Sequence, residues 1–332
     1  MRFSALSVHD GVRVLQDRAE SGRERPWRQH KEQSLELANS FARIGDAKAQ
    51  RVRMCGGYLK FAECPSGHEK KLIEAYFCQV RLCPMCAWRR SLKIFAQLNK
   101  VIHVACQRQR MRFIFLTLTC RNVHSEDLPE MLDKLFVAWQ RLSQRKVFRE
   151  NVLGWFRALE VTHRMDRDEY HPHFHVLLAV RPSYFGQNYL KQAEWAELWR
   201  QALRVNYTPI TDVRAVRPKR KGQTVEAAVA EIGKYAVKPD DYIDPDDQLG
   251  TDYAVETLDK ALKNRRLVAY GGIFKEIRRE LRMEDVEEAD LVKIDEDEPE
   301  TCTCDVCRSE LMSVVYRWHI GLRNYVAEED QQ

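Results

Sequence analysis

Residues 171–180 read HPHFHVLLAV, and this stretch decides the fold. Its β-branched and aromatic side chains end before an Arg-Pro pair, which is typical of a buried strand. Successive side chains of a strand point to opposite faces, so His173 and His175 share one face while Phe174 enters the core. Two imidazoles about 7 Å apart along one strand can converge on a single divalent metal.

His171 is in phase with this pair, but the Pro172 that follows it predicts that His171 precedes the strand. A His-x-His sequence taken alone is most often a half-buried strand whose imidazoles meet solvent. We favour a metal site here because other elements of the chain carry further residues that the same reaction would need.

Two neighbouring strands are predicted. Residues 111–119 alternate strictly and carry threonines along one face. Residues 155–162 form a strand joined to the histidine strand by a short polar connection, which predicts an antiparallel hairpin. Pairing about its middle places Glu160 opposite residues 173–175. Glu160 is then either a third metal ligand beside two imidazoles or a cross-strand carboxylate paired with an arginine.

A helix predicted over residues 225–238 carries the next chemical element. Glu231, Tyr235 and Lys238 are spaced i, i+4, i+7 and lie on a stripe separate from its buried face. A tyrosine between a carboxylate and lysines can attack a phosphate that a metal polarises. In isolation, an exposed tyrosine with charged neighbours is the ordinary case.

Ten cysteines in a chain without a secretory signal point to metal rather than to disulfides. A Cys-x-x-Cys sequence at 83–86 is a zinc knuckle, and residues 64–68 have the look of an opposing one. Zinc needs four ligands and six candidates are present, so one zinc with two spare residues and two zincs sharing ligands both stay open. The candidates are Cys55, Cys64, His68, Cys78, Cys83 and Cys86. A second zinc site of unusual spacing would use Cys302, Cys304, Cys307 and His319.

The charge is unevenly distributed. The net charge is +5, but residues 284–300 hold ten acidic side chains and one lysine, so the rest of the chain carries about +14. Such a charge is typical of a polyanion-binding protein. No apolar run reaches membrane-spanning length and no signal peptide opens the chain, which predicts a cytoplasmic protein. The basic residues expected to contact DNA are Arg89, Arg90, Arg214, Arg217, Lys219, Arg220 and Lys221.

Three of these stretches together resemble the rolling-circle replication initiators of small plasmids, the single-tyrosine branch of the HUH endonucleases. Residues 115–119 (FLTLT) resemble their first motif, residues 171–177 their metal-binding motif, and residues 231–238 (EIGKYAVK) their tyrosine motif. The order and spacing also agree, over roughly residues 50 to 280. The acidic tract and the late cysteines depart from the family pattern.

The resemblance implies an α+β fold with a central antiparallel sheet flanked by helices, and the cysteines add an N-terminal zinc-binding module. It implies a catalytic Mg²⁺ or Mn²⁺ on His173, His175 and Glu160. Tyr235 would form a 5′-phosphotyrosine intermediate, aided by Lys238, and Glu231 would activate water for a second cut.

Four segments are expected: a helical extension (1–50), the zinc-binding module (51–100), the nicking and strand-transfer domain (105–280), and an acidic linker with a cysteine-containing end (281–332). Residues 184–205 are expected to form a helix, and residues 255–282 to be helical with a break at Gly271–Gly272.

The implied partners are plasmid double-strand origin DNA, single-stranded DNA at the nick, and the host helicase and DNA polymerase. A homodimer stays open, and no membrane partner is expected. Two alternatives also stay open: an HUH transposase or relaxase with the same site residues, and a non-enzymatic zinc-dependent DNA-binding protein.

Overall fold

The computed structural model describes residues 8–9, 12–19, 21–67, 69–216, 237–294 and 310–328. The chain divides into two compact units, which we call the cysteine unit (1–90 with 288–332) and the histidine unit (91–287). The division falls within helix α3 (Pro84–Arg108). The C-terminal segment is therefore grouped with the N-terminal one, while the division into four segments stays a prediction.

A five-stranded antiparallel sheet forms the histidine unit, in the order β8-β5-β7-β6-β9. The expected α+β class is confirmed. The histidine stretch lies on the central strand of this sheet. The strands are β5 (Arg112–Thr119), β6 (Val152–Arg164), β7 (Glu169–Val180), β8 (Thr211–Ala215) and β9 (Val268–Gly272).

The predicted hairpin is formed by β6 and β7. A 3-10 turn (Met165–Arg167) joins the two strands, followed by Asp168 in the left-handed region. Glu160 is directly opposite His173, as expected from pairing about the middle of the hairpin. The expectation that His171 precedes the strand is wrong, because β7 begins at Glu169. The regular ladder to β5 ends at His173, so the proline at 172 lies where β7 has only β6 as a regular partner.

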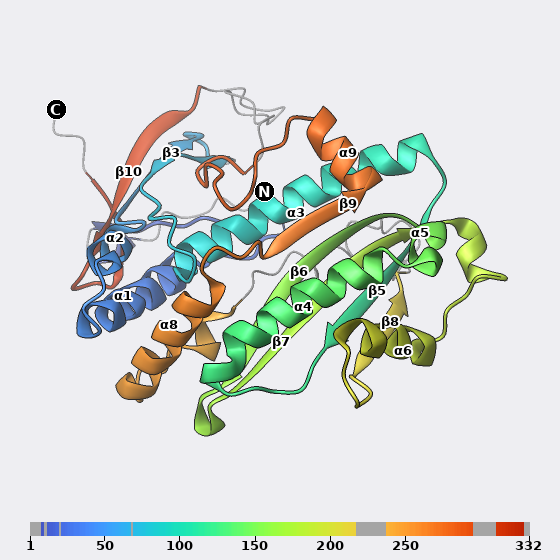
Figure 1. Cartoon of the computed structure of the whole chain (residues 1–332). Helices are drawn as coiled ribbons and strands as arrows, with labels where there is room; N and C mark the ends of the chain where they lie inside the picture. Colours follow the sequence, from blue (N-terminus) through green and yellow to red (C-terminus); the bar gives the residue numbers. More distant parts are fainter. Residues whose placement is uncertain are drawn as a thin grey trace. The chain divides into compact units, whose positions relative to one another are not determined.

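Helices cover the face of the sheet opposite the two histidines. α4 (Leu128–Ser143) runs along β6 and β7, with α6 (Gln192–Leu203) beside it (Figure 1). The Phe174 ring lies 6.3 Å from the Trp139 ring of α4 and 6.4 Å from the Trp199 ring of α6. All three side chains are buried. This packing fixes the alternation predicted for the strand and leaves His173 and His175 on the other face.

The end of the histidine unit differs from the predicted helix over residues 255–282. The chain forms α8 (Gln248–Leu262), strand β9, and α9 (Ile273–Glu280). β9 pairs with β6, and Gly271 is required there because a Cβ would lie 2.1 Å from the Trp155 ring. The helix predicted over 184–205 is likewise shorter: a 3-10 turn (Pro182–Phe185) precedes α6. The described part of the unit also contains α5 (Lys146–Asn151) and 3-10 turns at Ser125–Asp127 and Pro239–Asp241.

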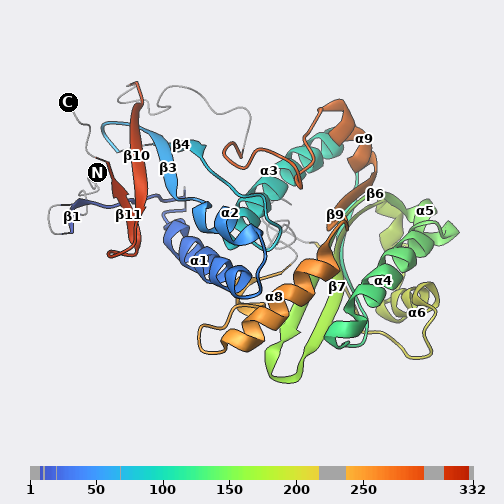
Figure 2. The same cartoon turned by 60° about the vertical axis from the view of Figure 1, so that its left-hand side comes forward.

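A four-stranded antiparallel sheet in the order β11-β10-β3-β4 organises the cysteine unit. Its strands are β3 (Tyr58–Glu63), β4 (Lys70–Ala75), β10 (Met312–His319) and β11 (Asn324–Ala327). A short pair, β1 (Val8–His9) and β2 (Val12–Arg13), precedes it. Helices α1 (Trp27–Arg43) and α2 (Lys48–Met54) lie side by side (Figure 2). Among the described residues, no helix is long and apolar enough to cross a membrane.

Candidate metal centres

Two imidazoles and one carboxylate converge on the face of the sheet that does not carry Phe174, in the histidine unit. The Glu160 Oε2 atom lies 2.7 Å from His175 Nε2 and 3.6 Å from His173 Nε2. The two Nε2 atoms are 3.2 Å apart. Because these three ligand atoms come from adjacent strands in register, a single divalent cation can be held by all three.

The hydrogen bonds around the imidazoles prepare the ring nitrogens for a metal. The His173 Nδ1–H group donates to the His171 carbonyl at 3.0 Å, which leaves a lone pair on Nε2, the nitrogen that faces Glu160. The His175 Nδ1 atom lies 3.4 Å from the Thr117 hydroxyl. The Asn122 amide oxygen accepts from His171 Nδ1 at 2.8 Å. His171 is thus held at the rim of the centre rather than in it.

The carboxylate of Glu160 is buried yet ionised. Burial alone would raise its pKa, but the contacts with His173, His175 and Lys238 outweigh burial and hold the pKa far below its usual range. The Lys238 ammonium donates to Glu160 Oε1 at 3.1 Å, and this bond raises the pKa of Lys238. The structure therefore brings one residue of the predicted tyrosine motif, Lys238, to the histidine centre. Tyr235 and Glu231 of the same motif lie outside the described residues.

One predicted DNA-contacting residue also lies on the metal-facing side of the sheet. Arg214 of β8 is opposite Phe115, whose ring stacks on His175 at 5.4 Å. The Arg214 side chain is 75% exposed and pairs with Asp212 at 2.7 Å. Arg217, Lys219, Arg220 and Lys221 lie outside the described residues.

Four buried cysteines form a second centre, in the cysteine unit. The sulfur atoms of Cys55 and Cys86 are 3.6 Å apart, those of Cys83 and Cys55 are 3.6 Å apart, and those of Cys78 and Cys86 are 3.7 Å apart. Zinc–sulfur bonds of about 2.3 Å in a tetrahedron place the sulfurs about 3.8 Å apart. A disulfide would place them about 2.05 Å apart. The separations therefore fit four thiolates around one ion.

Burial raises the pKa of Cys55 and of Cys86, so a cation is what would deprotonate these two at neutral pH. For Cys83, hydrogen bonds from the neighbouring side chains outweigh burial and hold the pKa well below its usual range. Of the six candidates, Cys64 lies apart from this cluster, in the turn between β3 and β4, where its N–H donates to the Glu69 carbonyl. Cys64 of the expected opposing knuckle is therefore not part of the four-cysteine group. His68, Cys302, Cys304 and Cys307 lie outside the described residues, and His319 Nδ1 accepts from the Leu322 N–H at 3.0 Å.

Sequence reasoning missed two residues of α1 that face the cysteines. Lys31 is 1% exposed and its ammonium donates to the backbone carbonyls of Arg53 at 2.8 Å and Cys55 at 2.7 Å. Ser34, one turn later and fully buried, has its hydroxyl 3.5 Å from the Cys83 sulfur. In the sequence, these two residues could be recognised only as a lysine and a serine on the apolar stripe of an amphipathic helix.

The expected DNA contacts of Arg89 and Arg90 are wrong for the structure, because both side chains are only 2% exposed. Arg89 donates to the carbonyls of Leu291 and Val292 at 2.8 and 2.7 Å. Arg90 donates to the Gln79 carbonyl at 2.9 Å. Both guanidinium groups thus satisfy backbone carbonyls inside the cysteine unit instead of facing a phosphate.

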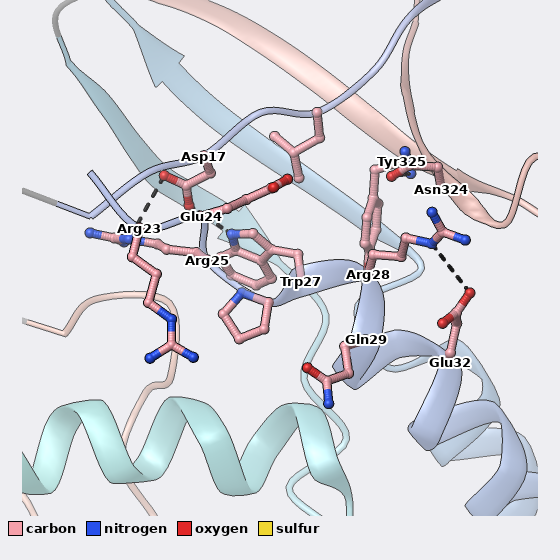
Figure 3. A pocket seen from close by; sticks show the side chains of 12 residues that line it. Asp17, Arg23, Glu24, Arg25, Trp27, Arg28, Gln29, Glu32, Asn324 and Tyr325 are labelled. Atoms are coloured by element: carbon pink, nitrogen blue, oxygen red, sulfur yellow. Dashed lines mark hydrogen bonds and ion pairs between the residues drawn. The ribbon is translucent and has the colours of Figure 1, made fainter. Parts of the chain in front are cut away.

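A hollow of about 490 Å³ opens beside the start of α1, in the cysteine unit (Figure 3). Several of its charged side chains pair with one another. The buried Asp17 carboxylate accepts from Trp27 Nε1 at 2.7 Å and lies 3.8 Å from Arg25, while Arg28 pairs with Glu32 at 3.3 Å (Figure 3). Ion pairs and hydrogen bonds in this hollow therefore fix the beginning of α1. The hollow is not a uniformly basic surface.

These observations define the class of the protein. It is an α+β chain with a histidine–carboxylate group on the sheet of one unit and a tetracysteine group in the other. The chain belongs to a replication protein family, whose model matches residues 69–326. It is 42% identical to a Protein rep of Bacillus amyloliquefaciens, over 96% of this chain and 99% of that protein. It is 39% identical to a Protein rep of Lactiplantibacillus plantarum (94% of this chain, 98% of that one) and 37% identical to one of Streptococcus pneumoniae (94% and 95%). No solved structure matches the chain.

These findings confirm the resemblance to plasmid rolling-circle replication initiators drawn from the three motifs. They favour a replication protein over the transposase and relaxase alternatives, which would carry the same site residues.

Proposed function

We propose that this protein is a metal-dependent, origin-specific DNA nickase that starts rolling-circle replication of a plasmid. The observation that carries the proposal is the group formed by His173, His175 and Glu160. Their ligand atoms lie within 4.8 Å of one another on adjacent strands of the central sheet. Two imidazoles with a carboxylate suit Mn²⁺ and, with water completing the shell, Mg²⁺.

The cation, when bound, withdraws negative charge from the scissile phosphate. The Tyr235 oxygen attacks the phosphorus, and the bond from phosphorus to the 3′ oxygen breaks as the new one forms. The products are a 5′-phosphotyrosyl link to the protein and a free 3′-OH that primes the host DNA polymerase. Lys238, held protonated by Glu160, adds positive charge beside the phosphate.

Replication must also end, and a tyrosine that is already linked to DNA cannot cut again. We assign the second cut to water activated by Glu231, which lies one helical turn before Tyr235 in the predicted helix. A second subunit's Tyr235 is the alternative nucleophile, and it would require a homodimer.

The DNA substrate is the plasmid double-strand origin, opened to a single strand at the nick with the aid of a host helicase in the cytoplasm. Arg214 is placed on the metal-facing side of the sheet and, together with Arg217 and the lysines and arginine at 219–221, would contact the phosphate backbone.

The tetracysteine group is proposed to hold a structural zinc ion on Cys55, Cys78, Cys83 and Cys86. Sulfur separations of 3.6 to 3.7 Å support this, as does the burial of all four side chains. Zinc here would stabilise the cysteine unit for DNA binding and take no part in cleavage.

Nicking of a supercoiled plasmid that carries the cognate origin tests the proposal. Wild-type protein with Mn²⁺ should convert supercoiled DNA to the open circle, and EDTA should prevent this. Lack of nicking by the metal-loaded wild type would overturn the proposal and favour a non-enzymatic DNA-binding protein.

A further inference from the structure

The buried ammonium of Lys31 is unusual in its surroundings. Its two acceptors are backbone carbonyls, and no carboxylate of the described residues is in ion-pairing contact with it. A charged lysine in the protein interior is strongly unfavourable unless an anion compensates it. The position therefore calls for a negative charge nearby that is not a carboxylate.

The tetracysteine group can supply that charge. Four thiolates around one Zn²⁺ carry a net charge of −2. One of the two carbonyls that Lys31 contacts belongs to Cys55, whose sulfur is in the group. On the same face of α1, the Ser34 hydroxyl reaches Cys83.

We propose that Lys31 is the counter-charge of a tetrathiolate zinc centre and that α1 docks stably only while the centre is loaded. This proposal rests on the proposed structural zinc. With the metal bound, the ammonium halves the net charge of the centre. With the metal lost, the four sulfurs are no longer held together beside α1, and the face of α1 that contacts them through Lys31 and Ser34 is destabilised.

The start of α1 provides a second site at which undocking can be observed. Trp27 is 2% exposed, and its ring lies edge-on to Trp88 at 4.6 Å, two residues beyond Cys86. Loss of α1 from its place should expose Trp27 and speed amide hydrogen exchange over residues 27–43, a readout independent of DNA cleavage.

The test compares wild type, Lys31→Met and the control Lys60→Met in the full-length protein. Lys60 lies on β3 of the same unit and pairs with Glu74 on the surface. Zinc affinity is measured by chelator competition, and ligand geometry by the absorption of the Co²⁺-substituted protein. We expect Lys31→Met to bind zinc about 10- to 100-fold more weakly, with an unchanged tetrahedral Co²⁺ spectrum. Lys60→Met should match wild type.

Hydrogen exchange of the wild type, with and without zinc, keeps the proposal testable if Lys31→Met fails to fold. Exchange over residues 27–43 should accelerate once zinc is removed. Equal zinc affinity of Lys31→Met and wild type, or unchanged protection of α1 without zinc, would overturn the counter-charge. A wild type that binds no zinc would overturn the structural zinc itself, and the counter-charge with it.

Discussion

Replacing Glu160 by glutamine separates the two interpretations of this carboxylate, as a metal ligand or as a cross-strand partner of a cation. The substitution keeps the size of the side chain and removes its charge. Glu160 contacts His175 at 2.7 Å and Lys238 at 3.1 Å, so both interpretations are compatible with the structure. They differ in whether the substitution lowers the affinity for the metal ion.

As a metal ligand, Glu160 should contribute strongly to affinity. Substitution of a group that only hydrogen-bonds to a metal-ligating residue typically lowers metal affinity by about 10- to 100-fold. Loss of the ligand itself should therefore cost at least about 100-fold, or about 2.8 kcal/mol. The free energy of unfolding without metal should change by about 1 kcal/mol or less. The Lys238 side chain is 53% exposed, so its ion pair with Glu160 contributes little to folding stability. Removing the buried charge of Glu160 also offsets the loss of that ion pair.

Titration with Mn²⁺, followed by calorimetry, measures the affinity, and urea unfolding in EDTA measures the stability. The matched control is Glu130→Gln, because Glu130 pairs with Lys134 on the surface of α4 and is 69% exposed. It should leave both quantities unchanged. If Glu160→Gln bound Mn²⁺ within about threefold of wild type, the carboxylate would be only the partner of Lys238.

Three other substitutions test separate parts of the account. Lys238→Met should slow cleavage on the order of tenfold while Mn²⁺ affinity changes little. The effect on the rate is modest because a half-exposed cation stabilises the transition state less than a buried donor does. An unchanged single-turnover rate would show that Lys238 has no part in cleavage. Cys83→Ser should lose zinc and lower folding stability or DNA affinity, yet the folded fraction should still cleave a short single strand; complete loss of cleavage with folding and binding intact would contradict the separation of roles. Glu231→Gln should nick normally but terminate about 100-fold more slowly, so that products longer than one plasmid unit accumulate; normal termination would point to Tyr235 of a second subunit.

The histidine centre could be predicted from the sequence because its geometry is local. A short polar connection fixes the hairpin, and the period of two then fixes which side chains share a face. Glu160 therefore falls opposite His173, and Phe174 enters the core, as the pattern predicts.

The parts that could not be predicted depend on contacts distant in sequence. Strand β9 is a short apolar segment between two helices, and only its pairing with β6 makes it a strand. β10 forms its ladder with β3, from the opposite end of the chain. The burial of Arg89 has the same origin, because its acceptors are the carbonyls at 291 and 292. The tetracysteine set needed such contacts too, since spacing could not distinguish Cys64 from the four residues that converge.

The central claim is that Tyr235 is the nucleophile, and the most direct measurement is the identity of the residue joined to DNA. A labelled single-stranded origin oligonucleotide is incubated with the protein and Mn²⁺, and the covalent product is digested and mapped by mass spectrometry. We expect a 5′-phosphate on Tyr235, and no adduct with EDTA or with Tyr235→Phe. Cleavage without any adduct, an adduct on another residue, or undiminished cleavage by Tyr235→Phe would contradict it.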